Sequence, residues 1–381
     1  MSTEENVFKG TSSRSWIEIR PGALNRNLHR IRESVGPHSA IIPMVKADAY
    51  GLGMEVVVRT LETENPWGYG VATVDEGVFI RSLGVTKPII IVSPLPPDAY
   101  DLAVSEGLTP TLSDINAVHQ FAASVDRMGL QARFHVEIDT GMGRSGFDRF
   151  RVREWGPVLA EFSTDQMILE GCYTHFHSAD VANDSSTLEQ WHLFQSTLNE
   201  MVVSKIELIH SCNGAAAIRY PSIAADAVRP GIFLYGGSVG EGIDPPEEVV
   251  QVKARVTLIR EVIEGATLGY GATYRAHKNE RWATLGIGYG DGFPRFLGNK
   301  GNSLLHGHRV PIIGRISMDM IVVDISGIED VMVGDTATLI GTDGGARITL
   351  DEVAQQADTI SYEILTGFTG RLPRILIKNG G

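Results

Sequence analysis

The sequence contains little cysteine, which limits the stabilising chemistry available to it. Only two of its 381 residues are cysteines, Cys172 and Cys212, and both lie inside strand-like segments. Disulfide frameworks and zinc sites need more cysteines at closer spacing. We therefore predict reduced, packed thiols and no metal site.

The chain is also short of positive charge and of long apolar runs. Its 33 basic residues are outnumbered by 46 acidic ones, giving a formal net charge of −13. Without a concentrated basic patch, this charge would repel nucleic acid and anionic lipid. The segment MSTEENVFKGTSSRSW lacks the apolar core of a signal peptide, and no apolar run is long enough to span a bilayer. We expect a cytoplasmic protein that binds neither nucleic acid nor membranes.

Apolar residues make up 43% of the chain, enough to build about two domains. The first part alternates eight apolar or β-branched runs with segments of helical spacing, such as Leu24, Leu28, Ile31 and Val35 after Pro21, or Trp191, Phe194, Leu198 and Val202. Alternating strands and helices predict an α/β fold, a (β/α)8 TIM barrel over residues 1–244, with functional residues at the C-terminal strand ends. The runs are AIIPMV (40–45), WGYGVAT (67–73), PIIIVS (88–93), LTPTLS (108–113), ARFHVEID (132–139), MILEGCYTHF (167–176), IELIHSCNG (206–214) and ADAVRPGIFLYG (225–236).

Residues 245–381 have a different pattern, an alternation of period two seen in Val252, Ala254, Val256 and Leu258. Such alternation is typical of half-buried strands. We predict a second, mostly β domain, with which a first strand near residues 15–20 could pack. A capping-box spacing, Thr349 to Glu352, predicts one helical segment over the following VAQQADTISYEIL.

Lys46, in IIPMVKADAYGLG, stands at the end of the first apolar run. A desolvated lysine at a barrel strand end can act as a Schiff-base nucleophile, because burial favours its uncharged amine. From this stretch alone, a surface lysine paired with a carboxylate such as Asp48 is the favoured interpretation.

The last two runs end in HSCNGAA and VRPGIFLYG. Loops after strands seven and eight commonly build the phosphate site of a TIM barrel. Asn213 with Gly214, and Gly231 with Ile232, could present unobstructed backbone N–H groups to an anion. Each glycine alone could be an ordinary turn, but the two pairs together favour a phosphorylated cofactor or substrate.

From Trp16 to about Arg374 the chain resembles the alanine racemases, the pyridoxal-phosphate-dependent enzymes of fold type III. The resemblance rests on eight motifs in the family's order. They are VKADAYGLG, EIDTGMGRSGF, THFHSAD, VRPGIFLYG, LGYGATYRA, GIGYGDGFPR, GRISMDM and SYEIL.

The resemblance implies an isomerase that interconverts L-alanine and D-alanine by two-base proton transfer on an external aldimine of pyridoxal 5'-phosphate, supplying D-alanine for peptidoglycan. Lys46 would hold the cofactor and act as one base, and Tyr270 of the second domain would be the other. Two unlike bases on opposite faces of one carbon suit racemisation. Both need lowered pKa values, and a cationic relay through His175 and Arg229 would help Tyr270. Without the resemblance, Tyr270 reads as a half-buried strand tyrosine.

The same resemblance assigns the remaining site residues. Arg144 would bind the cofactor's phenolic oxygen and lie near the substrate carboxylate, and His175 would stack on the ring. Met318 would offer its backbone N–H to the substrate. The cofactor phosphate would be bound by Tyr50, Tyr362, Asn213, Gly214, Gly231 and Ile232. A narrow access channel favouring small amino acids would be lined by Asp180, Tyr289, Arg295, Arg315 and Ile360.

Arg229 matches the family's arginine that faces the pyridine nitrogen. An arginine is always charged and cannot accept that nitrogen's proton, so the ring would be a weaker electron sink, which limits side reactions. The alternative for this residue is a simple ion pair with Asp226.

Three positions depart from the family pattern. Glu137 stands where many members have a carbamylated lysine, and we predict that it orients Arg144 without modification. Gly214 replaces a serine that contacts phosphate, which would weaken cofactor binding by one charge-assisted hydrogen bond or less. His177 also replaces a smaller residue, and the sequence offers no reason for it.

The resemblance further implies a head-to-tail homodimer in which Lys46 and Tyr270 of different chains form each site. A racemase of broader specificity for small amino acids such as serine, and a non-enzymatic carrier of the cofactor, remain as alternatives. A decarboxylase of the same fold is disfavoured, because it would need a carboxylate in place of Arg229 and a cysteine after Cys212. A barrel aldolase that works without a cofactor is less favoured still.

Overall fold

The computed structural model describes residues 12–203 and 206–377. These residues divide into two compact units. The barrel unit contains residues 24–234 and 238–246, and the β unit contains the described residues up to 23, 235–237 and from 247 onward. Residues 1–11, where no signal peptide is predicted, lie outside the described residues.

Eight parallel strands form the sheet of the barrel unit, and each falls within one of the predicted runs. Their spatial order is β2-β10-β9-β8-β6-β5-β4-β3. A parallel bridge between Met44 and Gly70 joins the two ends, so the sheet closes on itself. The predicted (β/α)8 barrel is thereby confirmed. The strands are β2 (Ala40–Ile41), β3 (Tyr69–Val71), β4 (Ile89–Ile91), β5 (Thr109–Leu112), β6 (Ala132–Asp139), β8 (Met167–Tyr173), β9 (Leu208–Asn213) and β10 (Ala227–Arg229).

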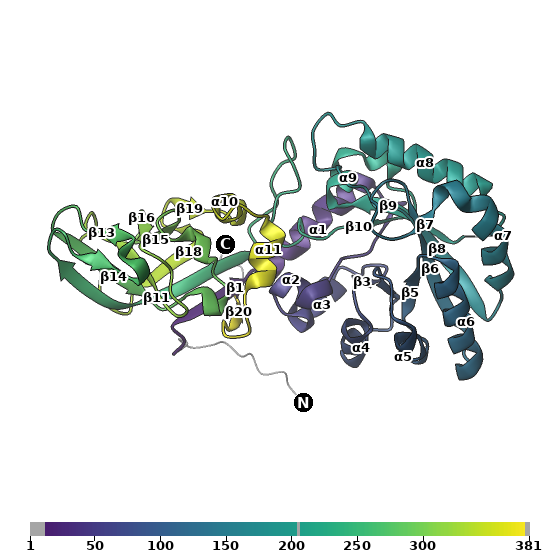
Figure 1. The fold of residues 1–381 in the computed structure, drawn as a ribbon, viewed down its shortest axis with the longest axis horizontal. Helices are drawn as coiled ribbons and strands as arrows, with labels where there is room; N and C mark the ends of the chain where they lie inside the picture. The colour runs from purple at the N-terminus through teal and green to yellow at the C-terminus, as the bar shows by residue number, and fades with distance from the viewer. Residues whose placement is uncertain (1–11, 204–205, 378–381) are drawn as a thin grey trace. The chain divides into compact units, whose positions relative to one another are not determined.

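Helices lie outside these strands (Figure 1). Helix α1 buries Leu24, Leu28 and Ile31, as its spacing predicts. Val202 does not continue α8, because Met201 is already extended and Val202 is 71% exposed. The helices are α1 (Pro21–Val35), α2 (Lys46–Gly51), α3 (Met54–Glu62), α4 (Val74–Ser82), α5 (Tyr100–Ser105), α6 (Ile115–Met128), α7 (Val152–Phe162), α8 (Ser186–Glu200) and α9 (Gly214–Arg219). A short strand, β7 (Phe147–Asp148), pairs with β6.

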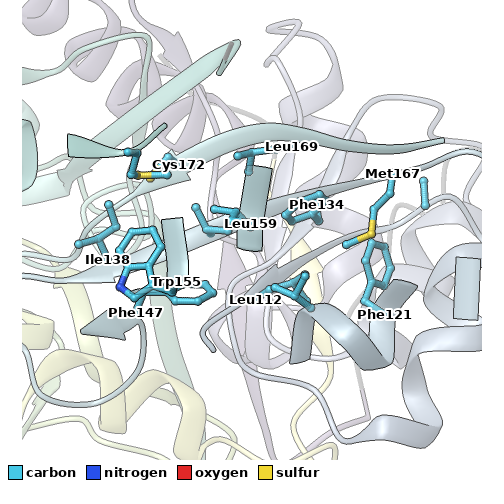
Figure 2. Packing of buried hydrophobic residues seen from close by; sticks show 14 of the residues in the cluster. Leu112, Phe121, Phe134, Ile138, Phe147, Trp155, Leu159, Met167, Leu169 and Cys172 are labelled. Atoms are coloured by element: carbon cyan, nitrogen blue, oxygen red, sulfur yellow. The ribbon is translucent and has the colours of Figure 1, made fainter. Parts of the chain in front are cut away.

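One large apolar cluster fills the space between strands and helices on one side of the barrel (Figure 2). Strand β6 contributes Phe134, Val136 and Ile138, which alternate with polar residues along the strand. Helix α7 contributes Trp155 and Leu159. Burying a side chain of this kind stabilises a fold by about 1.5–3 kcal/mol. The alternation means that the other residues of β6 face the barrel interior.

The β unit is built on a second sheet, ordered β19-β18-β15-β16-β17-β14-β11-β1-β20. Strand β1 pairs antiparallel with β11, Ile17 lying opposite Val252. The unit's mostly β character agrees with its period-two pattern. The strands are β1 (Ser15–Ile19), β11 (Val250–Val262), β14 (Glu280–Leu285), β15 (Asn302–Leu305), β16 (His308–Ile313), β17 (Ile321–Asp324), β18 (Thr336–Asp343), β19 (Ala346–Ile348) and β20 (Arg374–Leu376), with β12 (Thr267–Leu268) and β13 (Tyr274–Arg275) as a separate hairpin.

Two details of the β unit differ from the prediction. Thr349 caps a helix, accepting a hydrogen bond from Glu352 N at 3.0 Å, but two helices follow instead of one: α10 (Leu350–Gln356) and α11 (Ser361–Gly367). The break follows from Asp358, whose φ of 58° is left-handed. Leu258 is 41% exposed because the register of β11 against β14 shifts just before it.

Both cysteines are buried and free, as predicted. None of the helices in the described part of the chain is long and apolar enough to cross a membrane.

Candidate active site

Lys46 follows β2 (Ala40–Ile41) and the bridging residue Met44, and it opens an unusual turn. The next four residues, Ala47 to Tyr50, all have positive φ values between 52° and 57°. Left-handed backbone costs about 1–2 kcal/mol per non-glycine residue, so the turn is strained. Two carboxylates hold it: Glu76 accepts from Ala47 N at 2.6 Å, and Asp48 from Met54 N at 2.7 Å. Asp48 thus stabilises the turn by accepting a hydrogen bond from the backbone. It forms no ion pair with Lys46 among the described residues, so that alternative is wrong.

Replacing Ala47 with glycine should raise the free energy of unfolding by about 0.5–1 kcal/mol, because glycine adopts positive φ without steric cost. Ala47 is exposed, so no packing is lost. The matched control is Ala123→Gly on the exposed face of helix α6, which should lower stability by a similar amount. Denaturant titration measures both, and a destabilising Ala47→Gly would contradict the strained turn.

The environment of Lys46 favours its neutral amine. Burial lowers its pKa, and the positive charges of Arg144 and Arg229 lower it further, against an opposing effect of Glu76. A lysine in this state is a nucleophile toward a carbonyl group, as the sequence predicts for this strand end.

Arg229 is buried at the end of β10, and its guanidinium group donates hydrogen bonds to several surrounding acceptors. Its Nη1 donates to His210 Nδ1 at 2.8 Å and to His210 O at 2.9 Å. Its Nη2 donates to Thr174 O at 2.9 Å and Ser211 O at 3.2 Å. Asp226 instead accepts from Ile209 N at 2.7 Å, so the predicted alternative ion pair does not form. Among the described residues, Arg229 Nε has no acceptor and remains available to a ligand.

His175 is neutral. Burial and the charges of Arg229, Arg144 and Lys46 lower its pKa to about 3. Its Nδ1 lies 3.4 Å from Arg229 Nη2, which can only donate, so the proton of His175 resides on Nε2. The expected hydrogen bond between Arg229 and His175 is therefore present. Only Arg229 is cationic, because the positive charges around His175 disfavour a second buried cation.

Glu137 does not contact Arg144. Its Oε2 accepts a hydrogen bond from Ser145 Oγ at 2.6 Å, and the described residues form no ion pair between Glu137 and the exposed Arg144. Glu137 therefore forms no direct ion pair with Arg144, although the charge of Arg144 acts on the Glu137 carboxylate, lowering its pKa against the larger raising effect of burial; that Glu137 orients Arg144 stays a prediction. The loop turns through Gly143 and Gly146, both at positive φ, and a Cβ on Gly146 would lie 3.1 Å from Glu137 Cγ. Because the loop passes so close to Glu137 at Gly146, Ser145 can donate its hydrogen bond to the Glu137 carboxylate. Burial raises the pKa of this carboxylate.

The predicted phosphate-binding residues of the barrel unit lie at the ends of β9 and β10. Asn213 caps helix α9 by accepting from Ala216 N at 3.0 Å. Gly231 leaves room for Tyr50, since a Cβ there would lie 2.2 Å from the tyrosine hydroxyl oxygen. Ile232 is buried beside it. At Gly231 the absence of a Cβ leaves space that the Tyr50 hydroxyl occupies.

Gly214 has space for a side chain, because the nearest atom to a built Cβ is Phe233 Cβ at 3.6 Å. Replacing Gly214 with serine should therefore lower the dissociation constant of the cofactor by about threefold to tenfold, the effect of part of one charge-assisted hydrogen bond. Gly214→Ala adds the same Cβ without the hydroxyl and should leave the constant unchanged. Fluorescence titration of cofactor-free protein measures it, and equal constants for the three proteins would exclude a phosphate contact at this position.

A second group of predicted residues lies in the β unit. Tyr270 begins a short 3-10 helix (Tyr270–Ala272) and is 68% exposed, more than a half-buried strand tyrosine would be. Arg315 lies beside this turn, its Nη1 at 3.0 Å from a Cβ built on Gly271. Tyr289 N donates to Ser317 O at 3.1 Å, which places Tyr289 next to Met318.

The remaining predicted residues are exposed or lie apart from these contacts. Ile360 and Tyr362 are 61% and 43% exposed at the start of α11, and Arg295 begins another 3-10 helix (Arg295–Leu297). Asp180 belongs to the barrel unit, where its carbonyl lies 2.1 Å from a Cβ built on Gly240. The predicted residues are therefore divided between the two units.

His177 is exposed, and its Nδ1 lies 2.6 Å from Ser178 Oγ. Its backbone N–H donates to Gln190, which also donates to Thr140 and to the His175 carbonyl. Nothing in these contacts explains a histidine at this position.

Three buried polar residues of the barrel interior were not predicted: His135, Glu170 and His210. They form a hydrogen-bonded chain that ends on Arg229. The signal for one of them was present in ARFHVEID, where Arg133, His135 and Glu137 alternate with the apolar residues of an expected buried strand. No such alternation marks Glu170 or His210.

The residues of the barrel unit fit pyridoxal phosphate by their chemistry. Lys46 supplies an amine of lowered pKa for the aldehyde, and Arg229 supplies one unused donor, Nε, for the pyridine nitrogen. Tyr50 with Gly231, and the start of α9, supply donors of the kind that bind phosphate. In the described residues no group of three or more histidines, cysteines or carboxylates could hold a metal ion.

Comparison with known protein families gives two matches that together cover most of the chain. Residues 19–239 match the family model "Alanine racemase, N-terminal domain", and residues 249–376 match "Alanine racemase, C-terminal domain". The alanine racemase of Halothermothrix orenii is 37% identical over 367 residues, covering 94% of this chain and 96% of that protein. "Alanine racemase 2" of Bacillus subtilis is 35% identical, covering 96% of this chain and 95% of that protein.

Solved structures give the same result. The crystal structure of the Bacillus anthracis alanine racemase with bound L-Ala-P has a TM-score of 0.90 at 33% identity, over 98% of this chain and 97% of that one. The Bartonella henselae alanine racemase with covalently bound pyridoxal phosphate has a TM-score of 0.88 at 27% identity, over 96% of this chain and all of that one.

Proposed function

Because this chain belongs to the alanine racemase family, we propose that it interconverts L-alanine and D-alanine with pyridoxal 5'-phosphate as cofactor and supplies D-alanine for peptidoglycan. One observation carries the proposal: an amine of lowered pKa, Lys46, lies in the same barrel as a buried arginine with a single unused donor. A carboxylate-bearing site would point to other reactions of this cofactor.

Each cofactor-binding residue has a role set by its chemistry. When bound, pyridoxal phosphate supplies a conjugated ring that accepts the electron pair left on the α-carbon. Lys46 would hold it covalently, and Arg229 Nε would donate to the pyridine nitrogen without giving up a proton. The phosphate would be bound by Tyr50, Tyr362, Asn213, Gly214, Gly231 and Ile232. His175 would pack on the ring, and Arg144 would bind the phenolic oxygen.

Two bases move the proton on opposite faces of the substrate. Lys46 exchanges it on one face, helped by the lowered pKa of its amine. Tyr270 exchanges it on the other, and the Nε2–H of neutral His175 donates a hydrogen bond that stabilises the phenolate of Tyr270. Met318 N–H, which has no acceptor among the described residues, binds the substrate with Arg144. Asp180, Tyr289, Arg295, Arg315 and Ile360 line a narrow channel that admits small amino acids.

The active enzyme is a head-to-tail homodimer, in which residues 1–244 of one copy bind the cofactor and residues 245–381 of the other contribute Tyr270. The exposure of Tyr270, Met318 and Ile360, between 51% and 68%, supports this arrangement, because each leaves a large side chain of the β unit uncovered in the single chain. The proposed location of the enzyme is the cytoplasm.

The direct test offers the purified, cofactor-loaded enzyme a panel of L-amino acids and follows optical rotation. We expect L-alanine to lose its rotation completely, with larger side chains reacting more slowly. A serine rate above the alanine rate would favour the broader-specificity racemase. Bound cofactor with no racemisation of any amino acid would favour the carrier and contradict the proposal.

A further inference from the structure

A chain of four buried polar side chains crosses the interior of the barrel. Arg229 Nη1 lies 2.8 Å from His210 Nδ1. His210 Nε2 lies 2.9 Å from His135 Nδ1, and His135 Nε2 lies 3.2 Å from Glu170 Oε2. At the far end, Arg133 Nη1 lies 2.9 Å from Glu170 Oε1. We call Arg229, His210, His135 and Glu170 the interior relay.

The relay runs from the C-terminal to the N-terminal ends of the barrel strands. Arg229 ends β10, whereas Glu170 lies at the middle of β8 and Arg133 is the second residue of β6. Arg133 and Glu170 line a cavity of about 570 Å³ together with Trp67, Thr109, Glu207 and Leu208. Apart from Glu170, these cavity residues lie at or just before the starts of their strands. The relay therefore connects the catalytic end of the barrel with its opposite end.

Local structure positions His135 and Glu170, the two members of the relay farthest from Arg229. The register of β6 against β8 skips Glu170, pairing Phe134 with Leu169 but His135 with Gly171. Such a bulge re-aims a side chain, here toward the interior. Gly171 makes room for the imidazole, since a Cβ there would lie 2.5 Å from His135 Cε1.

The direction of every hydrogen bond in the relay follows from its two ends. Arg229 only donates, so His210 Nδ1 must accept, and the proton of His210 lies on Nε2. His210 Nε2–H donates a hydrogen bond to His135 Nδ1. The proton of His135 therefore lies on Nε2, which donates a hydrogen bond to the carboxylate of Glu170. Both rings are neutral Nε2–H tautomers, and no other arrangement satisfies all four groups.

The charges agree with this arrangement. Burial and Arg229 lower the pKa of His210, and burial lowers that of His135, which favours the neutral form of both rings. Burial opposes ionisation of Glu170, but hydrogen bonds from His135 and Arg133 hold its pKa below the usual value. Arg229 has no carboxylate within ion-pair distance among the residues described. A buried cation without a direct partner is costly, and the relay extends to it the influence of a distant carboxylate.

We propose that His135 and Glu170 are positioning residues for the racemase reaction: acting through His210, they fix the Nη atoms of Arg229 and leave only Nε for the cofactor's pyridine nitrogen. This role rests on the proposed function. Four Nη hydrogens are directed at five acceptors, two of them on His210. A His210 ring free to flip would present a donor to Arg229, and the guanidinium would turn.

The first experiment reads the tautomers directly. The holoenzyme is labelled with nitrogen-15 histidine, and the ring nitrogen shifts are recorded between pH 6 and 9, with His135→Gln and His210→Gln spectra used for assignment. We expect both rings to remain neutral with the proton on Nε2 over the whole range. An Nδ1–H tautomer, or a ring that becomes charged in this range, would overturn the relay even if the enzyme is fully active.

The second experiment separates positioning from folding. A glutamine at position 135 can accept from His210 and donate to Glu170, as the imidazole does, whereas a leucine can do neither. We expect His135→Leu to lower kcat about tenfold with KM unchanged, and His135→Gln to stay within about threefold of the parent. Glu170→Gln should lower kcat severalfold. The matched control, Glu207→Gln, removes a carboxylate 3.8 Å from Arg133 that does not contact His135, and should have no effect.

Equal kcat values for folded His135→Leu and His135→Gln would refute the positioning role. A wild-type protein that racemises no amino acid would instead refute the proposed function, and with it the relay's part in that reaction, whatever the tautomers are.

Discussion

Replacing Lys46 with alanine lowers kcat/KM for alanine racemisation by about 10⁴-fold in either direction, because the variant loses both the covalent attachment of the cofactor and one of the two bases. The lowered pKa of this amine makes it competent for both roles. Initial rates measured by chiral chromatography give the loss. The absorbance of the lysine-bound cofactor should disappear in the same variant.

The matched control is Lys87→Ala. Lys87 is another partly buried lysine of the barrel unit, and its Nζ lies 3.1 Å from Glu62 Oε1, outside the candidate site. We expect it to keep the parent's activity and cofactor absorbance. Substantial racemisation by Lys46→Ala, with the control unchanged, would show that another group anchors the cofactor.

Replacing Tyr270 with phenylalanine lowers the rate of racemisation by about 10³-fold. Proton exchange should be lost on one face of the substrate and should persist on the face that Lys46 serves. Racemisation needs removal on one face and return on the other. With Lys46 intact, one enantiomer of alanine should still exchange its α-hydrogen with deuterium in heavy water while keeping its configuration. The other enantiomer should not exchange. Mass spectrometry of the separated enantiomers measures both rates.

Tyr274→Phe is the control for this prediction. Tyr274 lies four residues away, and its hydroxyl donates to Glu280 Oε2 at 3.1 Å within the β unit. It should racemise alanine like the parent. Exchange of both enantiomers at equal rates in Tyr270→Phe would mean that one base serves both faces.

The barrel could be predicted from the sequence because its strands and helices are marked by short, local patterns of apolar residues. Parallel strands buried on both sides appear as short apolar runs, and each of the eight runs contains one observed strand. Residues such as Leu24, Leu28 and Ile31 are spaced for a helix and are buried as expected. The prediction failed where a single backbone conformation decides the outcome. Asp358 in a left-handed conformation divides the last helical segment in two, and no periodicity shows it.

The candidate site was only partly predictable. Motifs located Lys46 and Arg229 at strand ends, but they could not show that Glu137 faces Ser145 instead of Arg144, which depends on the path of one loop. The positive φ values after Lys46 likewise depend on tertiary contacts, because alanine and tyrosine do not favour a left-handed backbone. The interior relay was missed because Glu170 faces inward through a skipped residue in the register, which has no signature in the sequence.

The central claim is that each site combines Lys46 of one chain with Tyr270 of another, and subunit complementation tests it directly. Lys46→Ala and Tyr270→Phe chains, each nearly inactive alone, are co-expressed with different affinity tags, and the mixed dimer is isolated by tandem purification. One of its two sites then holds both native bases, so about half of the wild-type activity per dimer is expected. A mixed dimer as inactive as its parents would contradict the shared site.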